Sequence, residues 1–188
     1  QAGLRRLRFN SAIRSSSAFC ASRVRPILFA CNIRFLHYNL PRANRVLTAT
    51  DYRQLADAVP NLAATKITGT SVYEACELMR MVPELQHFFG ESLFPIGCLY
   101  GQCSLLSSFG PLFPSRTHEF FEYGKRGQFD KLFPMLRQYL DVTDEVLSPT
   151  RGKTLIDGAY DKMAVRMSGI DFPPRLLSPY EWFPEETF

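Results

Sequence analysis

Two stretches of sequence decide the fold, FLHYNLP at residues 35–41 and LAATK at residues 62–66. The first ends at Pro41, and the residue before a proline favours extended backbone, so we predict a strand that leaves into a loop. Lys66 lies 28 residues after Tyr38. That distance leaves room for one helix between two strands, which is typical of a parallel sheet with crossover helices.

The same alternation of strand and helix continues along residues 35–110. The short apolar runs end near Tyr38, Lys66, Phe89 and Leu106. Helical patterns lie between these runs, near residues 50–59, 71–82 and 94–100. Thr50-Asp51 and Ser71 offer side chains that cap the first two helices, and Pro83 ends the second. We therefore predict an α/β fold with four parallel strands.

The remaining segment, residues 111–188, predicts helices followed by a proline-rich tail. The helical patterns cover residues 115–124, 128–147 and 153–168. Pro134 lies inside the second, so we expect a kink or a break there. Four strands cannot close a (β/α)8 barrel, although a spacing of 28 residues suits one of its units, which take about 31 residues each. The sequence thus predicts either a small open α/β sheet or half of a barrel.

Composition excludes several classes of protein. The chain has 188 residues, of which 46% are apolar and 21% are charged. These values are typical of a globular domain and exclude a disordered tail, a collagen-like repeat and a small disulfide scaffold. No apolar run approaches the roughly 18 residues that a membrane-spanning helix needs, so we expect no membrane association.

Charge separates the first residues from the rest. Residues 1–50 hold nine arginines and no acidic residue, whereas residues 51–188 carry a net charge of −5. Within this basic part, residues 1–34 form an Arg- and Ser-rich arm. Such an arm is typical of a mitochondrial transit peptide, or of a segment that binds RNA or anionic lipid. We favour a third interpretation, a start that is truncated or frame-disturbed and is not native domain sequence, and we expect no nucleic-acid partner.

The five cysteines are odd in number and show no CxxC spacing, and Cys98 and Cys103 are the closest pair. This pattern indicates reduced cysteines in an intracellular protein. The three histidines show no metal-ligand spacing, and we interpret His37 as structural. There is also no phosphate loop or dinucleotide fingerprint, so we predict neither a metal nor a nucleotide cofactor.

The order of motifs resembles the dihydrodipicolinate synthase / N-acetylneuraminate lyase family, whose members are Schiff-base aldolases on a (β/α)8 TIM barrel. Tyr38–Pro41 resembles the YNxP motif that ends the fifth strand, and Ala64–Gly69 resembles the lysine motif that ends the sixth. Gly90 matches the glycine that ends the seventh strand, and Gly101–Ser108 resembles the segment of the eighth. The likeness runs over roughly residues 35–180 and includes Pro173–Leu176. It implies the last four strand–helix units of the barrel, with the half barrel at residues 35–110.

This resemblance implies that Lys66 attacks a 2-keto acid such as pyruvate and forms an imine. A desolvated lysine at the end of a strand has a lowered pKa and is a usable nucleophile. Tyr38 is the candidate proton shuttle, and Thr68 faces the same side of the chain as Lys66. Gly90, Ser92 and Ser108 are the other candidate substrate-binding residues. The alternatives are a solvated loop lysine, a core tyrosine, and residues that merely form turns.

Departures from the family pattern bear on the substrate and on activity. Ala43 stands where lysine-pathway synthases have an arginine, with Arg42 and Arg45 nearby. Ser92 and Leu93 stand where sialic-acid lyases have an acidic pair, while Glu91 lies one residue early. A generic 2-keto-acid lyase or aldolase that needs no cofactor fits better. Because the family's first four strands have no counterpart, the alternative is an inactive fragment or a degenerate member.

The resemblance also implies a homo-oligomer for the full-length family. We expect a cytoplasmic protein, or a mitochondrial one if the arginine-rich arm is a genuine targeting segment.

Overall fold

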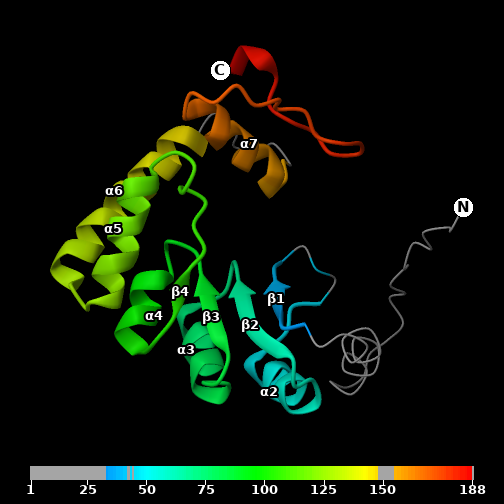
Figure 1. The fold of residues 1–188 in the computed structure, drawn as a ribbon, viewed down its shortest axis with the longest axis vertical. Coiled ribbons are helices and arrows are strands. Elements are labelled where there is room, and N and C mark those ends of the chain that lie inside the picture. The colour runs from blue at the N-terminus through cyan, green and yellow to red at the C-terminus, as the bar shows by residue number, and fades with distance from the viewer. Residues whose placement is uncertain (1–32, 42, 44, 148–154, 188) are drawn as a thin grey trace, which may run out of the picture. The chain divides into compact units, whose positions relative to one another are not determined.

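The computed structural model describes residues 33–41, 43, 45–147 and 155–187. Its strands form one sheet in the order β1-β2-β3-β4 (Figure 1). They are β1 (Phe35–Asn39), β2 (Leu62–Ile67), β3 (Gln86–Phe89) and β4 (Ser104–Leu105). β1 pairs in parallel with β2, and β3 pairs in parallel with β4. The four strands predicted from the apolar runs are therefore confirmed, although the last is shorter than the run that predicted it.

The chain divides into two compact units, one ending at His87 and the other beginning at Phe88. The basic arm predicted at residues 1–34 falls almost entirely outside the described residues, as does Arg42. Within the described ranges, no helix is both long and apolar enough to cross a membrane.

The described residues of the first unit form β1, β2 and two helices, α2 (Ala49–Ala58) and α3 (Val72–Met81), which pack against each other. A capping box starts each helix: a hydroxyl accepts the backbone N–H of the third helical residue, whose carboxylate accepts the cap residue's own N–H. Ser71 caps α3 as predicted. Thr48, not Thr50, caps α2, because Asp51 lies three residues after Thr48, at the position a capping box requires.

Apolar side chains from both helices fill the core of this unit. Tyr52 and Leu55 of α2 are buried, as are Ala75, Leu78 and Met79 of α3. Val59 and Val82, which follow the two helices, have no exposed surface. This burial, more than local helix propensity, stabilises helices as short as ten residues.

In the second unit, the residues outside the gap at 148–154 form four α-helices and a final turn. They are α4 (Phe94–Tyr100), α5 (Pro114–Lys125), α6 (Phe129–Leu147), α7 (Asp157–Met167) and the 3-10 turn η2 (Glu185–Thr187). Of the kink or break predicted at Pro134, the break is wrong, since α6 runs through this residue as one helix. α7 begins at Asp157, and residues 153–154 of the predicted helix lie outside the described ranges. The proline-rich residues 172–176 form neither helix nor strand.

Aromatic rings hold the second unit together. Phe94, Phe120 and Tyr139 come from α4, α5 and α6, and the Phe120 ring lies 5.5 Å from Phe94 and 5.1 Å from Tyr139 between centroids. Gly124 allows this packing, because a Cβ there would lie 2.5 Å from Cε1 of Phe94. A separate small core forms around Ala159, Met163 and Phe183.

Candidate functional site

Three of the predicted site residues meet at the ends of β1 and β2. The parallel register places Tyr38 opposite Lys66. Thr68 follows β2, and its hydroxyl lies 3.3 Å from the hydroxyl of Tyr38. Both strands point the same way in Figure 1, so these residues share one edge of the first unit. Ligands of parallel α/β sheets bind at this carboxyl edge of the strands.

Lys66 is buried within a strand. Its exposed fraction is 5%, and its neighbours Thr65 and Ile67 are buried with it. The alternative of a solvated loop lysine is therefore wrong. A lysine held in a strand at this depth is shielded from water, as a nucleophilic lysine requires.

Tyr38 differs from Lys66 in its exposure. Its side chain is 41% exposed, so the alternative of a core tyrosine is wrong. The contact with Thr68 joins two hydroxyl groups, either of which can donate the hydrogen bond. A hydroxyl that both donates and accepts, beside a buried lysine at the end of a strand, can transfer a proton to or from a bound molecule.

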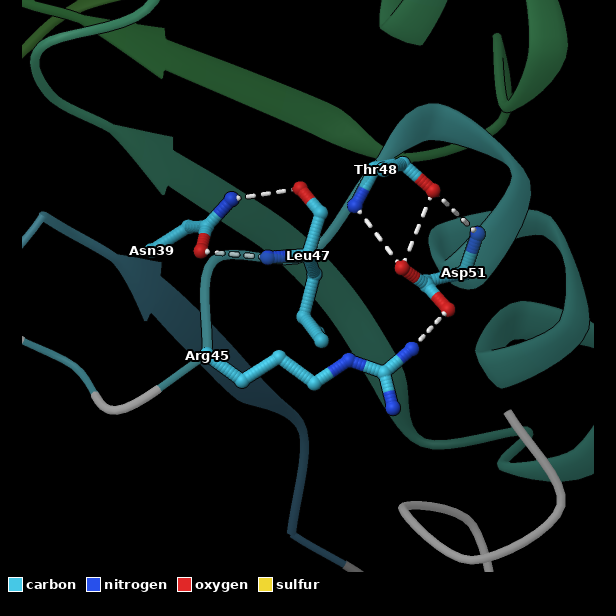
Figure 2. A network of polar contacts seen from close by, with 5 residues as sticks. All are labelled: Asn39, Arg45, Leu47, Thr48 and Asp51. Atoms are coloured by element: carbon cyan, nitrogen blue, oxygen red, sulfur yellow. Dashed lines mark hydrogen bonds and ion pairs between the residues drawn. The ribbon is translucent and has the colours of Figure 1, made fainter. Parts of the chain in front are cut away.

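Asn39 organises the loop behind Tyr38, a role that the sequence interpretation missed. Its side-chain N–H group donates to the carbonyl oxygen of Leu47 at 2.8 Å, and its side-chain oxygen accepts from the Leu47 N–H at 3.0 Å (Figure 2). Asn39 is only 3% exposed and Leu47 only 8%. The amide thus holds Leu47, eight residues further along the chain, against the end of β1. The signal in the sequence is an amide at the buried end of a strand, just before Leu40-Pro41.

Arg45 contacts the capping box of α2. Its guanidinium pairs with the carboxylate of Asp51, whose second oxygen accepts hydrogen bonds from the N–H and hydroxyl of Thr48 (Figure 2). This arginine, one of the two near Ala43, therefore has a carboxylate partner within the chain. Two contacts therefore hold the residues that precede α2, one between Asn39 and Leu47 and one between Arg45 and Asp51.

The second unit carries Gly90, Ser92 and Ser108. The carbonyl of Gly90 accepts the N–H groups of Leu93 and Phe94, so this glycine begins the turn into α4. Ser92 is exposed in that turn. Ser108 is exposed in the loop after β4, and its backbone N–H donates to Oε1 of Glu91 at 2.7 Å.

Glu91 is a second residue whose role the sequence interpretation missed. The same oxygen that accepts from Ser108 also accepts the hydroxyl of Ser107 at 2.5 Å and the N–H of Phe109 at 3.3 Å. One carboxylate oxygen thus shapes the loop that follows β4. The available signal in the sequence was that Glu91 lies one residue before the position of the acidic pair in sialic-acid lyases.

A buried histidine supports the strand that carries Lys66. Nε2 of His87 lies 3.0 Å from the Val82 carbonyl, which only accepts, so Nε2 carries the proton. Nδ1 then accepts from the hydroxyl of Thr65 at 2.9 Å. Thr65 has no exposed surface and His87 is 2% exposed, so this hydrogen-bonded chain lies inside the first unit.

Burial lowers the pKa of His87 below its ordinary value of 6.5, and burial also lowers the pKa of His37. The unfolded chain therefore takes up protons at a pH where the folded chain does not. The two neutral histidines therefore contribute their full share to the free energy of unfolding above about pH 6.5. Below that pH the free energy of unfolding decreases, by at most about 1.4 kcal/mol per pH unit for each histidine. Urea unfolding between about pH 7.5 and pH 5.5 measures this slope.

The control for this prediction is an exposed histidine of the second unit. His87→Gln should make the dependence on pH less steep, whereas His118→Gln should leave it unchanged. An equal slope for the wild type and His87→Gln would contradict the assignment.

Comparison with solved structures identifies the fold. A prophage protein of the dihydrodipicolinic acid synthase family from E. coli K12, solved in complex with pyruvate, matches with a TM-score of 0.74 and 18% identity over 93% of this chain. N-acetylneuraminate lyase from Fusobacterium nucleatum matches with a TM-score of 0.72, and dihydrodipicolinate synthase from Bacteroides thetaiotaomicron with 0.74. These two are 14% and 13% identical and match over 93% and 94% of this chain. The fold is that of the dihydrodipicolinate synthase family.

The resemblance drawn from the motifs is thus confirmed at the level of the fold. The chain spans 58–60% of the length of these three structures. It has four parallel strands with helices, consistent with part of the eight-stranded barrel that such proteins form. Sequence comparison with family models and with curated proteins gives no match.

Proposed function

We propose that this chain is part of a Schiff-base lyase or aldolase that acts on a 2-keto acid such as pyruvate. The observation that carries the proposal is the buried Lys66 opposite Tyr38, at the carboxyl ends of two parallel strands. The fold supports it, because the same strand ends hold these two motifs in the family that the sequence resembles.

In the proposed reaction, the neutral amine of Lys66 attacks the keto carbon and forms a carbinolamine. Loss of water gives a protonated imine, which withdraws electrons from the neighbouring carbon. That carbon then releases or accepts a carbonyl partner through an enamine, and hydrolysis frees the lysine. Every step is a proton or group transfer, so the reaction needs no redox cofactor or metal.

Tyr38 is proposed to carry the protons, because it pairs with Lys66 in the strand register and its hydroxyl contacts the hydroxyl of Thr68. Thr68 would hold an oxygen of the substrate through its hydroxyl. Gly90, Ser92 and Ser108 stay proposed substrate contacts of the second unit. Arg45, already paired with Asp51, is a poor candidate for a clamp on a second carboxylate, which favours a simple keto acid.

A second candidate function is non-catalytic, a degenerate barrel fragment. The observation that favours it is that the chain spans 58–60% of the length of the three matched structures. Tyr38, 41% exposed on β1, would then be a surface residue rather than a site residue. A homo-oligomer and a cytoplasmic or mitochondrial location stay predictions for either candidate.

Borohydride trapping tests the proposal directly. The purified chain is incubated with pyruvate and borohydride, and its intact mass is measured before peptide mapping. We expect one reduced pyruvate adduct, located on Lys66. A folded chain without an adduct, or with adducts spread over exposed lysines, would support the non-catalytic candidate.

A further inference from the structure

Two cysteines of the second unit lie side by side. Cys98 is in α4, and Cys103 comes directly before β4. Their sulfur atoms are 3.7 Å apart, and both side chains are partly buried. A disulfide bond joins sulfurs at about 2.05 Å, so the two atoms need to approach by only about 1.7 Å.

Two glycines leave the room that these sulfurs occupy. A Cβ on Gly97 would lie 2.7 Å from the sulfur of Cys103, and a Cβ on Gly124 would lie 2.9 Å from the sulfur of Cys98. Both distances are shorter than atoms tolerate. The pair is therefore fitted between α4, α5 and the start of β4, with a glycine beside each sulfur.

We propose that Cys98 and Cys103 form a redox-active dithiol that small-molecule disulfides, such as oxidised glutathione, convert to an intramolecular disulfide. The Cys98 thiolate attacks one sulfur of the small disulfide and releases one thiol. The Cys103 thiolate then attacks the sulfur of Cys98 and releases the second thiol. The chain loses two protons and two electrons, and the small disulfide is reduced to two thiols.

The environment assigns different roles to the two sulfurs. A hydrogen bond from Cys103 lowers the pKa of Cys98, which makes Cys98 the attacking thiolate. The hydrogen bond to Cys98, together with burial and the charge of Cys98, raises the pKa of Cys103. Once Cys98 is in the mixed disulfide, its negative charge is gone, and Cys103 loses its proton more readily. The order of the two steps follows from these contacts.

The consequence is a covalent link within the second unit. The new bond would close residues 98–103 into a ring and fix α4 to the residue before β4. Because a crosslink restricts the unfolded chain, the oxidised form should unfold at a higher temperature than the reduced form. The proposal is independent of imine chemistry, since neither cysteine lies in the first unit.

Oxidation of the full chain with oxidised glutathione tests the proposal. After blocking of remaining thiols and peptide mapping, we expect a Cys98–Cys103 crosslink and the loss of two free thiols. Cys103→Ser should stop at the first step, with glutathione held on Cys98, whereas Cys98→Ser should leave Cys103 largely unmodified. Cys76→Ser is the matched control and should leave the crosslink unchanged.

Three outcomes would overturn the proposal. They are two free thiols remaining at these positions in the folded wild type, stable glutathione on both sulfurs, or a crosslink to a different cysteine. Glutathione on Cys103 rather than Cys98 in the single variants would overturn the assigned order of attack.

Discussion

Lys66→Arg should abolish the pyruvate adduct that we expect borohydride to trap on the wild-type chain. Arginine also has a long basic side chain, but its guanidinium stays protonated and offers no nucleophilic nitrogen. Because Lys66 is the only predicted imine-forming residue, the loss should be complete rather than partial. The measurement is intact mass after incubation with pyruvate and borohydride, followed by mapping of the modified peptide.

Two further variants separate chemistry from folding. Lys66→Met keeps a long side chain but removes the amine from a site that is 5% exposed. It should also give no adduct while keeping the circular dichroism of the fold. Lys125→Arg, at an exposed position at the end of α5, should trap pyruvate as the wild type does. An adduct that persists in Lys66→Met would show that another amine reacts and would reject the mechanism.

The strands and most helices were predictable because their signals are local. Proline at position 41, the apolar run that ends at Lys66, and the Ser71 cap each act through neighbouring residues. The same locality explains the error at α2, where Thr50 directly before Asp51 looked like a cap. The true cap lies three residues before Asp51, because the hydroxyl has to reach the N–H of the third helical residue.

The break predicted as one outcome at Pro134 is absent for a different reason. Proline removes one hydrogen bond and crowds the preceding turn of a helix. In α6 these costs are outweighed by packing, since Leu132, Met135 and Tyr139 on the same helix are all buried. Tertiary burial therefore keeps α6 continuous at a position where local rules alone predict a kink or a break.

The site was predictable only where strand register determines position. The 28-residue spacing of Tyr38 and Lys66 implied that both lie near strand ends. The parallel pairing of β1 with β2 places the two residues opposite each other. Asn39 and Glu91 could not be assigned in this way. Their partners, Leu47 and the loop after β4, are chosen by loop conformation, which short-range patterns do not encode.

Asn39→Ala should destabilise the first unit by about 2 to 4 kcal/mol, because the substitution leaves both the N–H and the carbonyl of Leu47 without this amide partner. Each buried backbone group without a hydrogen bond costs about 1 to 3 kcal/mol, and Leu47 is largely shielded from water. Urea unfolding at neutral pH measures the difference.

Asn61→Ala is the matched control, because its amide also bonds a backbone group, the carbonyl of Ile33, but in an exposed setting. Water can replace that partner, so we expect a loss of no more than about 1 kcal/mol. If both variants lose the same stability, the amide of Asn39 does not hold the loop. If only Asn39→Ala is strongly destabilised, the side chain of Asn39 holds Leu47 in place. The motif that begins at Tyr38 then combines a candidate catalytic residue, Tyr38, with a structural residue, Asn39, that fixes the neighbouring segment.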